Sequence, residues 1–163
     1  MKISACYIVR DEACELRRSL RSVRAAADEI IVVSTAGSMA VASAAVEFGG
    51  HLYDFPWQND FSVARNYALK HTTGGIVIFL DADEYFFHPE RVRETLEKMI
   101  HENPAVDIIM TRLCNFMTAN VKTDALYDYS PRILRMPGLH YEGMIHEQPV
   151  RDDGSERIII YGD

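Results

Sequence analysis

The stretch Ile76 to Phe86 reads IVIFLDADEYF and carries the strongest fold signal in the chain. Five apolar residues run into Asp81, Asp83 and Glu84, and two aromatic residues follow. An uninterrupted apolar run of this length is typical of a strand that is buried on both faces, as in parallel sheets. The carboxylates follow at the carboxyl end of that strand, the edge at which open α/β sheets bind their ligands.

Strand and helix patterns alternate on both sides of this stretch. Such alternation predicts an α/β fold with a mostly parallel central sheet and helices on both faces. Beyond residue 115 the pattern weakens: 131–136 and 157–161 are possible strands, and 138–149 resembles a loop with short extended pieces. The other predicted strands are 3–9, 29–34, 51–55 and 106–113. The predicted helices are 16–23, 40–48 and 61–70, the last of which is capped by Asp60. A fourth predicted helix has Pro89 in its first turn and ends at Pro104.

The overall composition indicates one globular domain. A chain of 163 residues is long enough to bury a core, and no apolar run approaches the roughly 20 residues that a membrane helix needs. The net charge of −7 argues against nucleic acid as a partner. Three widely spaced cysteines without a CxxC pair indicate reduced thiols rather than a disulfide framework or a zinc site, so we expect a cytoplasmic protein.

The DAD motif, Asp81 to Asp83, favours a divalent cation. Alternate residues of an extended segment face the same way, so two carboxylates are directed towards one point. Their repulsion is relieved by a metal ion, and oxygen ligands suit Mg²⁺ or Mn²⁺, which also bind phosphate oxygens. The alternative from the residues alone is a solvated turn or a cap of the next helix.

A set of segments in a fixed order extends this interpretation. It comprises ACYIVRDEACELRRSLRSV (5–23), DEIIVVS (28–34), WQNDFSVARNYAL (57–69), GGIVIFLDADEYF (74–86), RILR (132–135) and YEGMIHEQP (141–149). Together they resemble the family 2 glycosyltransferases, which have the GT-A fold, and in particular bacterial enzymes of the lipopolysaccharide-core β-glucosyltransferase type. The resemblance covers most of the chain.

The resemblance implies a nucleotide-diphosphate sugar donor, expected to be a UDP-sugar, in a nucleotide-binding part of about 1–113. Arg65 of the ARN sequence would reach the nucleotide, because a guanidinium binds phosphate or base edges as a rigid fork. Asp81 would contact the ribose or a metal-bound water, and Asp83 would bind the cation directly. The remaining residues implied for the nucleotide are Ile8, Val9, Arg10, Ser34 and Ala82.

The resemblance also implies roles for the IHE sequence in the acceptor-side part, about 114–163. His146 would be a third metal ligand or a phosphate donor. Inverting transfer needs a carboxylate that takes the proton of the acceptor hydroxyl, and Glu147 is the first candidate and Glu142 the second. The acceptor would be a polysaccharide, lipopolysaccharide or protein, which places the enzyme in cell-envelope biosynthesis and, for a lipid-linked acceptor, at the inner face of the membrane.

Two departures from the family pattern leave alternatives open. Ser34 stands where an aspartate usually binds the base, and the chain ends at RIIIYGD, earlier than expected, so we expect a truncated acceptor-side part. A relative that binds sugar nucleotides without catalysis is therefore one alternative. A phosphatase of the haloacid dehalogenase type is another, because a DxD after an apolar strand also marks its nucleophile. The oligomeric state, sugar and acceptor are not predicted.

Overall fold

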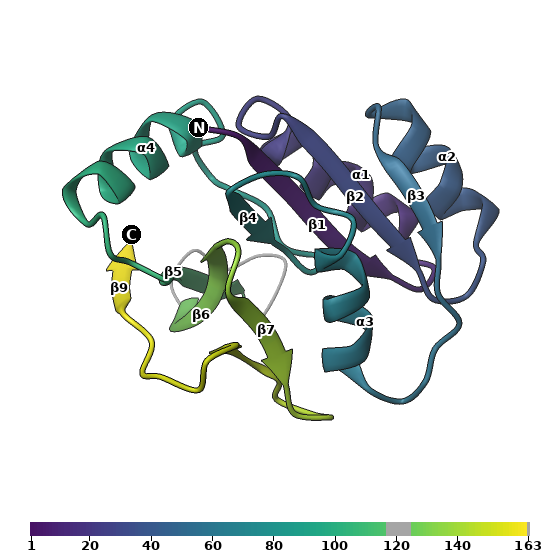
Figure 1. Ribbon diagram of the computed structural model, residues 1–163. Helices are drawn as coiled ribbons and strands as arrows, with labels where there is room; N and C mark the ends of the chain where they lie inside the picture. The colour runs from purple at the N-terminus through teal and green to yellow at the C-terminus, as the bar shows by residue number, and fades with distance from the viewer. Residues whose placement is uncertain (117–124, 163) are drawn as a thin grey trace.

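The computed structural model describes residues 1–116 and 125–162, so part of the expected acceptor-side part lies outside the described residues. None of the described helices is long and apolar enough to cross a membrane. The helices are α1 (Ala13–Val23), α2 (Met39–Glu47), α3 (Phe61–Leu69) and α4 (Val92–Glu102). The strands are β1 (Ile3–Val9), β2 (Glu29–Ser34), β3 (His51–Asp54), β4 (Ile76–Phe79), β5 (Ile108–Phe116), β6 (Ala125–Arg135), β7 (Leu139–Glu142), β8 (Gln148–Arg151) and β9 (Ile159–Gly162) (Figure 1).

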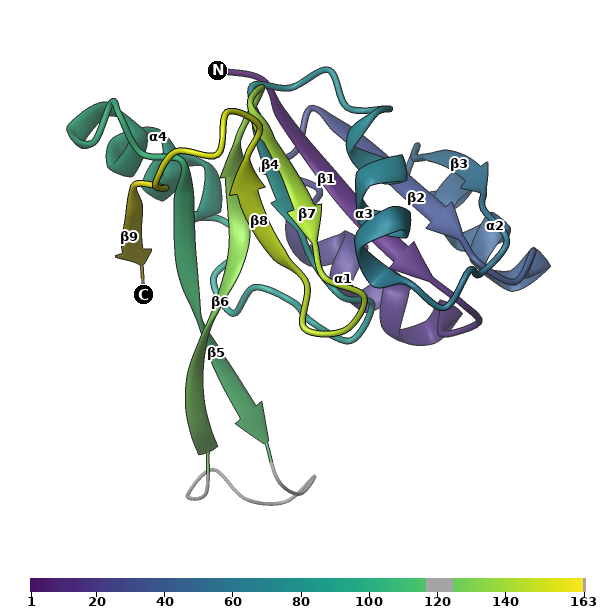
Figure 2. The same cartoon turned by 60° about the horizontal axis from the view of Figure 1, so that its bottom comes forward.

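One large sheet organises the molecule, with the strand order β3-β2-β1-β4-β6-β5-β9. The first four strands in this order are parallel, and β6 runs antiparallel to both of its neighbours, β4 and β5. The predicted α/β fold with a mostly parallel sheet is therefore confirmed. Figure 2 shows that the β5–β6 hairpin extends well beyond the rest of the sheet.

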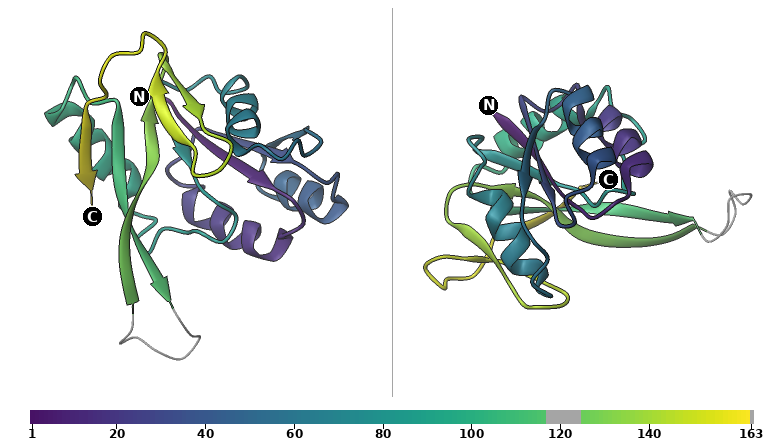
Figure 3. Two further views of the ribbon diagram at one scale, coloured as in Figure 1. Left: turned by 90° about the horizontal axis from the view of Figure 1, so that it is seen from below. Right: turned by 90° about the vertical axis from the view of Figure 1, so that its right-hand side faces the viewer.

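Helices cover both faces of the sheet, as predicted. Alternate residues of β1 point to opposite faces, so Tyr7 packs in a core with α1, α2 and α4, whereas Cys6 packs in a second core with α3 and β7. Figure 3 shows α3 on the side of the sheet opposite α1 and α2. The two cores fix β1 and β4 from both sides, so the loops at their carboxyl ends start from a rigid base.

Local sequence signals set the ends of the helices. The Asp60 side chain accepts a hydrogen bond from the backbone N–H of Val63 at 3.2 Å, which confirms the predicted cap of α3. Gly49, with φ of +70°, follows α2 in a conformation that favours glycine. The prediction for Pro89 was wrong: α4 begins at Val92, because residues 89–91 form a turn and Val92 is the first side chain to reach the core.

The weakly patterned last third also forms strands. The expected strands at 131–136 and 157–161 correspond to β6 and β9, and the expected loop at 138–149 contains a two-stranded sheet of β7 and β8. The hairpin loop between β7 and β8 contains two residues with positive φ, Gly143 at +103° and His146 at +59°. The hairpin packs against α3, where Asn66 bonds both the backbone carbonyl and the backbone N–H of Tyr141.

Candidate active site

The sheet has a topological switch point between the neighbouring strands β1 and β4. From β1 the chain proceeds to β2 and β3 on one side and then returns to β4 on the other side. At such a switch point the loops at the carboxyl ends of the two strands diverge and leave room for a ligand. Arg10 follows β1, and Asp81 follows β4, so two of the residues predicted for the nucleotide lie in the loops at this switch point.

Arg65 enters the site from α3 and is almost completely buried, with 5% of its surface exposed. Its Nε donates to Glu147 at 2.6 Å and one terminal nitrogen donates to Asp81 at 3.0 Å. The guanidinium lies over the rings of Phe79 and Tyr141, at 4.5 and 5.3 Å from their centres. Arg65 is therefore not a surface charge of a helix: it is a buried fork that joins the carboxylate of the DAD motif to that of the IHE sequence.

Arg132 completes the cluster and was missed by the sequence analysis. This residue of β6 donates from one nitrogen to Asp81 at 2.6 Å and to Glu84 at 2.5 Å. Because β6 pairs with β4, the side chain reaches across to the carboxylates that follow β4. The only signal in the sequence was its position in the RILR segment, which contributed to the family resemblance without indicating a contact.

Two guanidinium groups hold Asp81, one on each carboxylate oxygen. Burial raises the pKa of Asp81, but the charges of Arg132 and Arg65 outweigh it, so the pKa lies below its ordinary value. For Glu84 the balance is reversed: burial raises its pKa, and Arg132 only partly opposes this effect. The two acids are thus held in different electrostatic environments although they share one arginine.

The residues of the β7–β8 hairpin divide into a buried and an exposed group. Glu147 is largely buried against Arg65, with 12% of its side chain exposed, whereas His146 is exposed. Glu142 is 67% exposed and lies 3.1 Å from His140, which also lies 2.7 Å from Asp152. Only the first candidate for a base, Glu147, therefore lies in the cluster with Arg65 and Asp81.

The predicted nucleotide residues have unequal access to solvent. Ile8 is half-buried, Val9 and Ala82 are buried, and Arg10 is exposed. The hydroxyl of Ser34 is buried and has no hydrogen-bond partner in the described part of the chain. Ser34 would therefore contact a base only if the surrounding backbone moved.

The DAD motif is not extended as expected: residues 82–83 form a turn and arginines bind both Asp81 oxygens, so of its two aspartates only Asp83 is open to a divalent cation. Within residues 1–116 and 125–162, no three His, Cys, Asp or Glu side chains lie close enough together to hold a metal. Both oxygens of Asp81 are occupied by arginines, while Asp83 is exposed and makes no hydrogen bond or ion pair with the described residues. Its free carboxylate oxygens suit Mg²⁺ or Mn²⁺, and the other ligands would come from a bound diphosphate and water.

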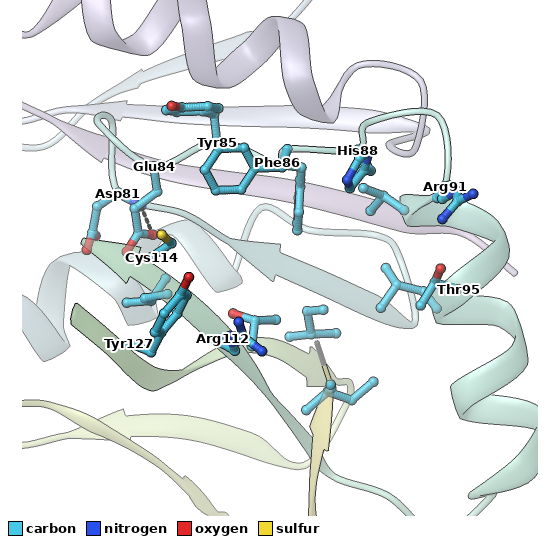
Figure 4. Close-up of a pocket in the computed structure, with 18 of the residues that line it drawn as sticks. Asp81, Glu84, Tyr85, Phe86, His88, Arg91, Thr95, Arg112, Cys114 and Tyr127 are labelled. Atoms are coloured by element: carbon cyan, nitrogen blue, oxygen red, sulfur yellow. Dashed lines mark hydrogen bonds between the residues drawn. The ribbon is translucent and has the colours of Figure 1, made fainter. Parts of the chain in front are cut away.

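Two hollows meet at Asp81. The smaller, of about 400 Å³, is here called the arginine hollow, and the larger, of about 1160 Å³, the aromatic groove. Figure 4 shows the groove, with Tyr85 and Phe86 facing Arg112 and Tyr127 across it. Asp83 lines the groove and His146 the hollow. The arginine hollow is lined by Phe61, Arg65, Asp81, Ser130, Pro131, Arg132, Tyr141, Ile145, His146, Glu147 and Gln148.

Comparison with known families matches residues 4–149 of the chain to Glycosyl transferase family 2. The chain belongs to this family. The match includes the switch point of the sheet, the DAD motif, Arg65, Arg132 and the IHE sequence. The broad resemblance read from the sequence is thus confirmed at the level of the family.

Among curated proteins, the chain is 26% identical over 160 residues to the SPbeta prophage-derived glycosyltransferase SunS of Bacillus subtilis, covering 91% of this chain and 35% of SunS. It is 45% identical over 83 residues to a TPR repeat-containing protein of Synechococcus elongatus, covering 51% of this chain and 21% of that protein. The chain thus spans about a third or less of the length of these relatives.

Solved structures share the fold. The crystal structure of residues 1–349 of S. aureus TarS has a TM-score of 0.61 at 17% identity, covering 76% of this chain and 39% of that fragment. Glucosyl-3-phosphoglycerate synthase from Mycobacterium tuberculosis, in complex with Mn²⁺ and uridine-diphosphate-glucose, has a TM-score of 0.55 at 20% identity, covering 68% of this chain and 43% of that one. Both likenesses support the GT-A-like fold.

Proposed function

We propose that this chain is the catalytic part of an inverting glycosyltransferase that moves a sugar from a nucleotide-diphosphate donor to an acceptor hydroxyl. The observation that carries the proposal is the cluster of Arg65, Asp81, Arg132 and Glu147 beside the switch point between β1 and β4. A family 2 chain whose carboxylates are held by arginines at its switch point is suited to group transfer from a diphosphate.

The donor would lie with its diphosphate near Asp81 and Asp83 and its nucleoside towards the carboxyl ends of β1 and β2. Asp83, with free carboxylate oxygens, is the proposed ligand of Mg²⁺ or Mn²⁺, and His146 is the second proposed ligand. The cation, when bound, would stabilise the negative charge that develops on the leaving diphosphate. Support comes from the mycobacterial neighbour, which was crystallised with Mn²⁺ and uridine-diphosphate-glucose.

Glu147 is the proposed general base. Its carboxylate would accept the proton of the acceptor hydroxyl as the new bond to the anomeric carbon forms and the bond to the diphosphate breaks. Arg65 would hold this carboxylate in position, since its Nε donates to Glu147 at 2.6 Å. Glu142 is less suited to the role because it is exposed and lies beside His140.

The acceptor class is a polysaccharide, a lipopolysaccharide or a protein, which corresponds to a role in envelope biosynthesis in the first two cases. We propose a location in the cytoplasm, at the inner face of the membrane if the acceptor is lipid-linked. A phosphatase of the haloacid dehalogenase type is no longer favoured, because the chain belongs to a glycosyltransferase family.

The decisive experiment measures melting temperature and donor turnover together. Millimolar Mn²⁺ with UDP should raise the melting temperature of the wild type, and Asp83→Asn should abolish the gain without lowering the melting temperature of the free protein, since Asp83 makes no described contact. Asp54→Asn, at the exposed last residue of β3, is the matched control. Equal gains in all three proteins would contradict the assigned metal site, and binding without hydrolysis or transfer by the longest available chain would favour the non-catalytic relative.

A further inference from the structure

Trp57 is the only tryptophan of the chain and lies in the loop between β3 and α3. Its backbone N–H donates to the carbonyl of Thr35 at 3.3 Å, which fixes the loop to the end of β2. The indole meets the ring of Phe61 edge-on, with 4.7 Å between ring centres. Both side chains are partly open to solvent, at 39% and 43% exposure, so the rings remain accessible to a ligand.

The aromatic pair continues into the charged cluster. Phe61 and Arg65 are four residues apart on α3, so their side chains lie on the same face of the helix, and both line the arginine hollow. Arg65 in turn donates to Asp81 at 3.0 Å. A single row therefore runs from Asp81 through Arg65 and Phe61 to Trp57, charged at one end and aromatic at the other.

We propose that the Trp57–Phe61 pair is the surface on which the nucleobase of the donor stacks. The inference rests on the proposed function, which puts the diphosphate at the charged end of the row. A nucleoside diphosphate has a matching form, with a flat ring at one end and, at the other, anionic groups that the cation proposed at Asp83 would neutralise. On a helix, Cβ atoms four residues apart, such as those of Arg65 and Phe61, are separated by about 5–6 Å. The ring centres of Phe61 and Trp57 are a further 4.7 Å apart. Together these distances are comparable with the length of a nucleoside diphosphate.

Stacking also accounts for base binding without an acidic residue at position 34. The buried hydroxyl of Ser34 offers no exposed polar group, whereas an aromatic face binds any base through its π-system. We therefore expect affinity that depends on the presence of a base more than on its identity. A sugar ring of the acceptor is the competing occupant, and it is an outcome of the test below.

The single tryptophan makes the test direct. In the presence of Mn²⁺, UDP, GDP and inorganic pyrophosphate are titrated against the wild-type protein, with binding followed by calorimetry and Trp57 followed by its fluorescence. We expect both nucleotides to change the emission and pyrophosphate to bind without changing it. Trp57→Leu should weaken binding of the nucleotides by roughly tenfold, at the lower end for an aromatic–base stack, and leave pyrophosphate unaffected.

Two further variants separate stacking from a general loss of structure. Trp57→Phe should retain most of the nucleotide affinity that Trp57→Leu loses, because phenylalanine keeps a ring at this position. Tyr161→Leu, which removes an aromatic side chain that is also exposed but lies on β9 at the opposite edge of the sheet, should change nothing. The inference is wrong if Trp57→Leu binds UDP as tightly as the wild type, or if free sugars alter the emission and nucleotides do not. If neither pyrophosphate nor any nucleotide binds, the proposed function fails, and this inference fails with it.

Discussion

Arg132 lies 2.6 Å from the Asp81 carboxylate, and the same nitrogen lies 2.5 Å from Glu84. One side chain of β6 thus holds two acids that follow β4. Like charges this close together destabilise a fold unless a cation lies between them, and Arg132 supplies that cation inside the protein. The arrangement connects the stability of the chain to the geometry of its proposed site, and it leads to the first prediction.

Replacement of Arg132 by Met should destabilise the protein by about 2–3 kcal/mol, because it leaves Glu84 buried without its ion pair. Because Asp81 is partly exposed, the loss of stability should be smaller than that for breaking a fully buried ion pair. Urea unfolding measures the change. Arg17→Met removes an exposed pair with Glu47 and should cost less than about 1 kcal/mol; equal losses in the two variants would mean that the cluster is not stabilising.

Glu147→Gln should lower kcat by about 10²–10⁴-fold, the usual contribution of a general base, while donor affinity changes little. Glu142→Gln removes an exposed carboxylate and should leave kcat within about twofold if Glu147 is the base. Transfer assays with saturating donor distinguish the two. A larger loss for Glu142→Gln would assign the base to the exposed position.

Gly74→Ala should destabilise the fold, because a Cβ at this position would lie 2.5 Å from the Ser4 hydroxyl and 2.9 Å from the Lys2 carbonyl. We expect a loss of about 2 kcal/mol or more, in the range of overpacked sites. Gly75→Ala is the neighbouring control, since the nearest atom there is 4.0 Å away. Thermal unfolding of both variants tests the packing of this turn, and a neutral result for Gly74→Ala would contradict it.

Glu29 should contribute stability that disappears in acid. Burial raises its pKa, but hydrogen bonds from Ser4 and Thr73 dominate and lower it from 4.5 to about 2. The folded state therefore binds its proton less readily than the unfolded state, so the contribution is complete above pH 4.5 and is lost as the pH falls towards 2. Its size is on the order of 2 kcal/mol.

Urea unfolding of Glu29→Gln and of the wild type at several pH values between 7 and 3 tests this assignment. The difference in free energy of unfolding between the two proteins should narrow as the pH falls. A difference that stays constant over this range would show that hydrogen-bond geometry, rather than the charge of Glu29, stabilises the turn.

Most of the fold was predictable because its signals are local. The apolar run of β4 and the capping aspartate at position 60 each act within a few residues, and the structure has both where they were expected. The prediction for Pro89 was wrong because its fixed φ suits a turn as well as a first helical turn, and the packing of Val92 decided between them.

The site was predictable only in part because its contacts are distant in sequence. The carboxylates and Arg65 carried motif signals, but Arg132 is 51 residues from Asp81, and no local pattern indicates that β6 is inserted beside β4. The burial of Arg65 also depends on a residue distant in sequence, Tyr141, which contacts it from β7. The segment that contains β7 and the start of β8 was expected to be a loop with short extended pieces, because the pattern of such short strands is too brief to show that they pair.

The position of β6 has a consequence for how the protein is made. Since β6 follows β5 in the chain but pairs with β4, the edge of β4 stays open while a ribosome is still synthesising the residues before 125. During that interval a nascent chain carries an unpaired apolar strand of the kind that recruits other strands. Chaperone binding to the emerging polypeptide should therefore be strongest before the ribosome reaches Arg135 and should fall once β6 has docked.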